Sequence, residues 1–189
     1  MKNMKWSLAC IFLLLCSISA FSQTDSEHRT VADVFNRSLS SAENDFVPAV
    51  EAMPEDKFNF APTNGEFKGV RTFALEVRHV DTVNYEFGAV ILGEKCPVET
   101  GTDENGADTL KTKDDILKYT TDSFAYLHKA LSALNEQNLV TPIPNPFGGK
   151  NSITRLGIAL IAVSHPFDHY GQMVEYLRMN NIVPPASRH

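Results

Sequence analysis

Hydrophobic residues recur every three or four positions in four stretches of this chain, which is the spacing of an α-helix with one buried face. They predict helices over about residues 30–53, 70–92, 113–137 and 152–181. No stretch alternates hydrophobic and polar residues convincingly, so no β-strand is predicted. Helices that each carry an apolar face bury it by packing against one another. The pattern therefore predicts an all-α fold, a four-helix bundle.

Residues suited to capping a helix stand at the ends of these segments. Thr30 with Asp33 resembles a capping box, in which each side chain accepts a hydrogen bond from the other residue's backbone. Thr112 with Asp115 is expected to cap the third helix in a similar way. Gly93 is expected to end the second helix, because glycine readily adopts the left-handed backbone found there.

The connections between the predicted helices are long and rich in helix-breaking residues. The most polar one covers residues 94–111, and the segment TPIPNPFGGK at 141–150 is rich in proline and glycine. Loops of such length are usually functional or mobile. They can also connect helices that are not adjacent in the bundle, so a simple up-down-up-down order of the four helices is not assumed. Pro48 and Pro166 fall inside predicted helices, where they are expected to bend them. No repeat divides the chain, so residues 23–189 are predicted to form a single domain.

The N-terminus has the features of a signal peptide. Two lysines precede the apolar run SLACIFLLLCSI, which is too short to span a membrane. Small residues at Ala20 and Ser22 predict cleavage before Gln23, with cleavage after Ala20 as the alternative. A lipid anchor at Cys16 is disfavoured because Leu15 precedes it. The mature protein is therefore expected in the periplasm or outside the cell, without stable membrane insertion.

Charge and cysteine content narrow the range of partners. Removal of residues 1–22 takes away two lysines and no acid, so the formal charge changes from −6 to −8. A chain this acidic is not expected to bind nucleic acid. Cys96 is then the only cysteine, so no internal disulfide is predicted. An inert buried thiol is the favoured interpretation of Cys96, with an intermolecular link as the alternative.

Three histidines are candidates for a metal site. His165 and His169 lie four residues apart on the fourth predicted helix, which places their Cβ atoms about 6 Å apart on one face. This spacing suits two ligands of one metal ion, although ordinary core or surface histidine pairs share it. His79, on the second predicted helix, is the candidate third ligand. The remaining histidines are interpreted as solvated: His28, His128 and His189.

Three imidazoles would leave a coordination position open for solvent or substrate, which is typical of catalytic sites. Zn²⁺ and Ni²⁺ are the favoured ions, with Fe²⁺, Co²⁺ and Mn²⁺ as alternatives, because all accept imidazole.

Four polar residues are candidate helpers at this site. Asp168 is a candidate to orient a ligand, or else an exposed helix acid, and Gln172 is either a site residue or a core amide. Glu76 is a candidate general base, or else a solvated or ion-paired residue, and Glu86 has the same two interpretations.

The histidine pattern resembles that of the DinB-like family, which has one histidine in the second helix and HxxxH in the fourth. The matching segments are FALEVRHVDTVNYEF around His79, SHPFDHYGQMVEYLRMNNIVPP around the pair, and the lead-in PTNGEFKGVRTF. The resemblance covers about residues 30–185. It implies a four-helix bundle with a divalent metal held by His79, His165 and His169. Family members are often dimers, so the resemblance also implies a homodimer.

The resemblance also suggests classes of activity. Some relatives are metal-dependent thiol S-transferases that use mycothiol or bacillithiol, and maleylpyruvate isomerase activity also occurs among them. Predicted export and negative charge argue against an anionic cytosolic thiol as the substrate here. The sequence therefore favours an exported metal-dependent enzyme, a hydrolase or S-transferase, acting on an unidentified small molecule. The alternatives are a non-catalytic periplasmic module that binds metal or a small molecule, and a structural bundle with polar core histidines.

Overall fold

A computed structural model describes residues 29–188 of the chain. The predicted signal peptide, His28 and His189 lie outside the described residues. Within this range no helix is both long enough and apolar enough to cross a membrane.

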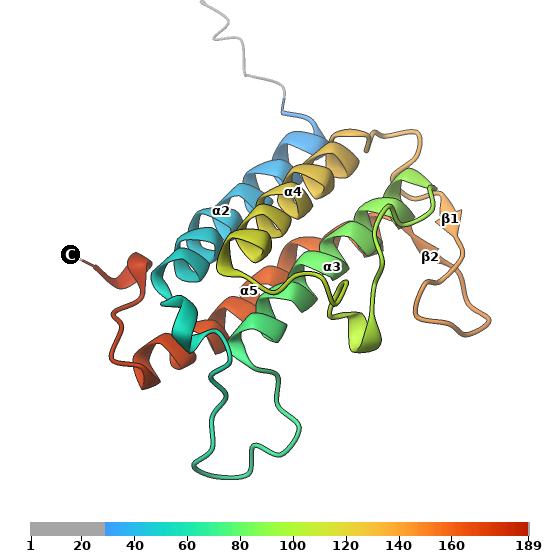
Figure 1. The fold of residues 1–189 in the computed structure, drawn as a ribbon. Helices are drawn as coiled ribbons and strands as arrows, with labels where there is room; N and C mark the ends of the chain where they lie inside the picture. The colour runs from blue at the N-terminus through green and yellow to red at the C-terminus, as the bar shows by residue number, and fades with distance from the viewer. Residues whose placement is uncertain (1–28, 189) are drawn as a thin grey trace, which may run out of the picture.

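Four helices pack side by side in the described part of the chain: α2 (Val31–Ala52), α3 (Phe73–Leu92), α4 (Lys113–Ser132) and α5 (Arg155–Met179). Each contacts two others: α2 packs against α4 and α5, and α3 packs against the same two helices (Figure 1). Helices α2 and α3 are consecutive in the chain but occupy opposite corners of the bundle. The long loop between them spans this diagonal, and the all-α four-helix bundle is confirmed.

The predicted caps form as expected. Thr30 and Thr112 each accept a hydrogen bond from the backbone three residues on, and Asp33 and Asp115 accept one in return. Gly93 ends α3 with φ of 73°. Pro48 and Pro166 both lie inside continuous helices.

Three boundaries and one connection differ from the sequence prediction. Helices α3 and α5 begin three residues later, after the caps Thr72 and Thr154. Helix α4 ends at Ser132 rather than near 137, because Asn135 and Asn138 bond to each other's backbone and compete with the helix. Two short antiparallel strands, β1 (Pro142–Ile143) and β2 (Ile153–Thr154), also form. Strands of two residues are too short to show alternation in a sequence.

Helix α3 is buried on nearly every side, because α4 and α5 pack against it. Its apolar residues join the core, and several polar residues are buried with them: Glu76, His79, Asp81, Thr82 and Asn84. Asp81 is completely buried against α4, and its carboxyl group accepts hydrogen bonds from Thr120 Oγ1 at 2.6 Å and Ser123 Oγ at 3.3 Å. Burial raises the pKa of Asp81 well above its ordinary value, although the two hydroxyl donors oppose this shift.

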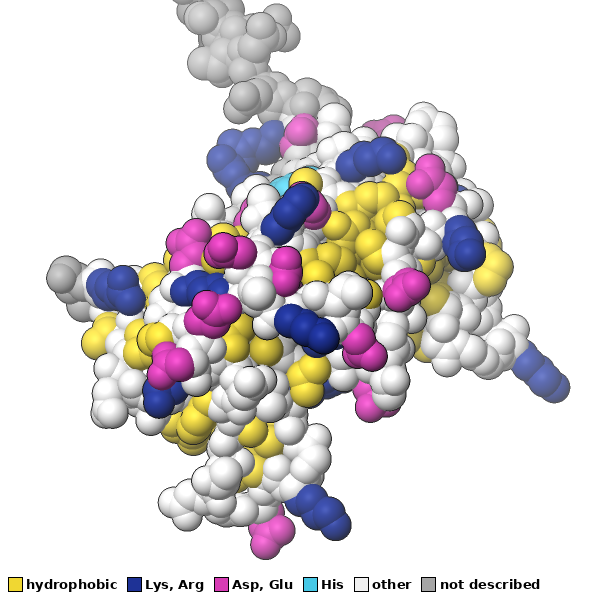
Figure 2. All heavy atoms as spheres, viewed as in Figure 1, with side chains coloured by type: hydrophobic (Ala, Val, Ile, Leu, Met, Phe, Trp, Pro, Cys, Tyr) yellow, Lys and Arg dark blue, Asp and Glu magenta, His cyan; other side chains and the backbone are white. Residues whose placement is uncertain are grey.

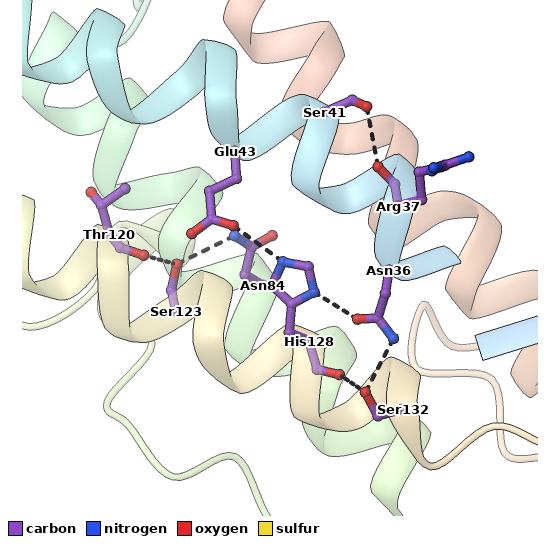
Figure 3. A network of polar contacts seen from close by, with 9 residues as sticks. All are labelled: Asn36, Arg37, Ser41, Glu43, Asn84, Thr120, Ser123, His128 and Ser132. Atoms are coloured by element: carbon purple, nitrogen blue, oxygen red, sulfur yellow. Dashed lines mark hydrogen bonds and ion pairs between the residues drawn. The ribbon is translucent and has the colours of Figure 1, made fainter. Parts of the chain in front are cut away.

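His128 is not the solvated residue that the sequence suggested. Its ring lies between α4 and α2, where Nδ1 is 2.6 Å from Asn36 Oδ1 and Nε2 is 3.1 Å from Glu43 Oε2 (Figure 3). The Asn36 amide nitrogen donates to Ala32 O and Ser132 Oγ, so its oxygen is the acceptor toward His128. His128 therefore links two helices on the side of α4 that faces α2.

Replacing Asp81 with Asn is expected to leave the protein at least as stable at pH 7, because Asn keeps an oxygen for Thr120 and cannot ionise. With a raised folded-state pKa, the parent loses stability as pH rises above the unfolded-state value near 4. The free energy of unfolding of Asp81→Asn, minus that of the parent, should therefore increase between pH 4 and 7, by at most about 1.4 kcal/mol per pH unit. Urea unfolding across this range measures the difference. Asp122→Asn, at an exposed position on α4, is the control. A difference that does not change with pH would contradict the argument.

Candidate metal centre

The three candidate histidines come together between two neighbouring helices. His79 lies on α3, and His165 and His169 lie one turn apart on α5. The ring centroids are 5.2 Å apart for His79 and His165, 5.0 Å for His79 and His169, and 4.4 Å for His165 and His169. One ring nitrogen from each residue lies within 4.8 Å of the others. This cluster could hold one metal ion.

The imidazoles have the chemical form that a metal requires. Burial, with a smaller contribution from the positive charge of Arg71, lowers the pKa of His79 to about 4. Burial also lowers the pKa of His165 to about 3, with smaller contributions from the other two histidines. Both rings are therefore neutral at pH 7 and carry a free lone pair. The Nδ1 atoms of His79 and His165 are buried without a hydrogen-bond partner. Such unpartnered nitrogens fit a site that binds a cation.

Glu76 holds His169 in place. Its Oε1 atom is 2.6 Å from His169 Nδ1, and the glutamate side chain is only 2% exposed. A carboxylate at Nδ1 favours the tautomer with the proton on that nitrogen, which leaves Nε2 as the ligand atom. Of the two alternatives to a general base, Glu76 is therefore not solvated but paired with another residue, His169. The residue precedes His79 by three positions on α3, but its contact with α5 is visible only in the fold.

Two other candidate helpers do not reach the histidines. Asp168 is exposed on α5, and within residues 29–188 its side chain makes no hydrogen bond or ion pair. It precedes His169 by one residue, a rotation of about 100° around the helix, which turns it toward solvent. Gln172 is exposed, so it is not a core amide, and it lies by a separate polar hollow with Arg71 and Glu76. It has no hydrogen bond to a histidine.

Glu104 is a site residue that the sequence analysis missed. It comes from the long polar loop between α3 and α4, and its Oε2 atom lies 3.8 Å from His79 Nδ1. Two arginines hold the loop: Arg71, just before the cap of α3, and Arg78 on α3. Arg71 donates to Asn105 Oδ1 and Asp103 O, and Arg78 donates to Gly106 O and Ala107 O.

Glycine allows this loop to close on itself. Gly106 N donates to Thr100 O at 2.8 Å, and Gly101 has φ of 67°. A Cβ atom at Gly101 would lie 2.1 Å from Gly106 O, so no other residue fits there without movement. Between the two glycines, Asp103 and Glu104 have φ of 53° and 59°, values that are uncommon outside glycine. The closed loop fixes Glu104 beside His79.

A cavity of about 480 Å³ opens beside His79 and His165. Helix α3, helix α5 and the proline-rich segment before β2 supply its apolar walls, and the polar loop supplies Cys96 and Glu104. Burial raises the pKa of the Cys96 thiol, which favours its protonated and less reactive form. Cys96 is half-buried at the cavity wall rather than enclosed in the core. Glu86 also lines the cavity, and burial together with Glu104 raises its pKa.

Known proteins share the fold of this chain, and a family model matches its sequence. Three solved structures share the fold: a DinB-like protein from Bacillus subtilis, a conserved protein from Enterococcus faecalis, and a DinB-like protein from Bacillus cereus. Their sequence identities are 19%, 14% and 16%, and their TM-scores are 0.59, 0.64 and 0.61, in that order. The alignments cover 78%, 80% and 80% of this chain and 92%, 97% and 93% of those chains.

A comparison with curated proteins gave no match. Residues 38–173, which are more than half of the chain and include all three clustered histidines, match the DinB superfamily. The chain belongs to the DinB superfamily.

Proposed function

We propose that this chain is an exported metal-dependent enzyme of the hydrolase or S-transferase type, with a divalent ion held by His79, His165 and His169. The observation that carries the proposal is the convergence of three imidazoles, two with buried unpartnered nitrogens, at the wall of a cavity. Export from residue 23 rests on the N-terminal sequence, and the expected homodimer rests on the family resemblance.

The donor set favours a catalytic site over a closed structural one. Three imidazole ligands suit Zn²⁺ or Ni²⁺ best, with Fe²⁺, Co²⁺ and Mn²⁺ as alternatives. Three protein ligands leave a position for solvent or substrate, and the adjoining cavity gives a small molecule access to it. When bound, a divalent cation supplies Lewis acidity and activates a nucleophile near neutral pH.

The chain's own residues have separate tasks in this proposal. Glu76 accepts the Nδ1 proton of His169 and fixes the direction of its Nε2 lone pair. Glu104, exposed at the cavity wall beside His79, is placed to accept a proton from a thiol or water bound in the cavity.

A non-catalytic module that binds metal or a small molecule remains the competing function. It shares the three histidines, but a metal that only stabilised the bundle would need no cavity beside it. The cavity at His79 and His165 therefore argues against a purely structural metal, and it fits either an enzyme or a module that binds a small molecule.

Protein isolated without a metal-affinity tag is expected to contain about one divalent ion per chain. Replacement of His79, His165 or His169 by alanine should each remove most of this metal, because two imidazoles bind far more weakly than three. Elemental analysis of the purified proteins measures the content, and circular dichroism confirms that the bundle is retained. His128→Ala is the matched control, because His128 lies between α2 and α4, outside the cluster. Metal content unaffected by His165→Ala would contradict the proposal.

Replacement of Glu76 by glutamine is expected to weaken metal affinity by about 10- to 100-fold, because the ligand His169 loses its charged acceptor. Competition with a chromophoric chelator measures the affinity. Glu175→Gln, an exposed glutamate on the same helix as His169, should leave affinity unchanged. Equal affinity in the Glu76→Gln variant and the parent would show that the buried carboxylate does not support the site.

A further inference from the structure

The cavity beside the histidines has a shape suited to an apolar body. Its apolar lining includes Val83, Phe87 and Val90 on α3, Ile161 on α5 and Phe147 in the segment before β2. The rings of Phe87 and Phe147 meet edge to face with centroids 6.0 Å apart. A volume of about 480 Å³ is in the range of pockets that enclose small organic ligands. These walls favour an aromatic or branched aliphatic group.

The charged residues of the cavity all have the same sign. Glu86, Glu94 and Glu104 line it, and no lysine or arginine belongs to its lining in the part of the chain that the structure describes. Lys95 follows Glu94 in the sequence, but it is exposed and lies outside the lining. By contrast, acidic and basic side chains are interspersed on the face seen in Figure 2. The cavity is therefore selectively acidic rather than typical of the surface.

The two arginines near the histidines, Arg71 and Arg78, do not line this cavity, although the positive charge of Arg71 reaches His79 and His165. Arg78 is engaged by the carbonyl oxygens of Gly106 and Ala107, and Arg71 by Asn105 and Asp103. Burial raises the pKa of Glu86, and repulsion from the nearby Glu104 carboxylate adds to the shift. A cation bound among them would relieve this repulsion.

The spacing of residues along α3 sets the distance between Glu86 and the histidines. His79, Val83, Glu86 and Val90 follow one face of the helix, so Glu86 lies about 10 Å along the axis from His79. His79, which is 7% exposed, also lines the cavity, with its Nδ1 atom buried and without a hydrogen-bond partner. The cavity thus offers the Glu86 carboxylate about two turns along α3 from the imidazoles, and Glu104 adds a second carboxylate beside His79.

We propose that this cavity binds small hydrophobic amines, with the ammonium group at Glu86 and the apolar body packed against Val83, Phe87 and Ile161 on the side of His79 and His165. The inference deepens the proposed function by naming a substrate class for the same site. It excludes anionic substrates, because they would meet three carboxylates at once.

Three probes of matched size test this charge preference: 2-phenylethylamine, 2-phenylethanol and 3-phenylpropionate. Titration calorimetry or NMR titration of the metal-free full chain at low salt is expected to give at least tenfold tighter binding for the amine than for the carboxylate. Equal binding of the two, or no binding of the amine, would overturn the proposal. The metal-free protein is used so that amine binding and metal binding are tested separately. Either prediction can then be contradicted while the other holds.

Variants locate the ammonium group. Glu86→Gln should weaken amine binding by about three- to tenfold and leave 2-phenylethanol binding unchanged, because it removes a charge without changing the shape. Glu99→Gln, an exposed acid outside the lining, is the matched control. Phe147→Ala should weaken the amine and the alcohol by the same factor. An unchanged preference for the amine in Glu86→Gln would overturn the assignment of its charge to this carboxylate.

Discussion

Buried imidazoles need a partner for each ring nitrogen, and this constraint organises the contact between α3 and α5. Glu76 satisfies Nδ1 of His169 from within the core, at 2.6 Å. The Nδ1 atoms of His79 and His165 are buried without such a partner. Leaving polar atoms unpaired in an apolar interior is costly, so a bundle that places three histidines here gains from a cation between them.

The helices could be predicted from the sequence because one apolar stripe per helix forms the core. Phe35, Leu39 and Phe46 on α2 recur at helical spacing and are all buried. The end of α4 and the hairpin could not be predicted in the same way. They depend on side-chain hydrogen bonds at Asn135 and Asn138 and on strand pairs of two residues, which leave little trace in hydrophobic periodicity.

The histidines could be found because two of them share a helix face and the third matches a family pattern. Their surroundings could not, because contacts made across the fold decide them. Glu76 meets His169 across 93 positions of sequence, and Glu104 reaches His79 only because Gly101 and Gly106 let the loop close. Asp168 shows that proximity in sequence can also mislead. It is next to His169 in the chain, but it lies on a different, exposed face of α5.

The most direct test of the account is anomalous diffraction from crystals of the protein loaded with Zn²⁺, recorded on both sides of the zinc absorption edge. The account predicts one strong peak bonded to ring nitrogens of His79, His165 and His169, with Glu76 still hydrogen-bonded to His169. Zinc bound elsewhere, with the three imidazoles left uncoordinated, would contradict it.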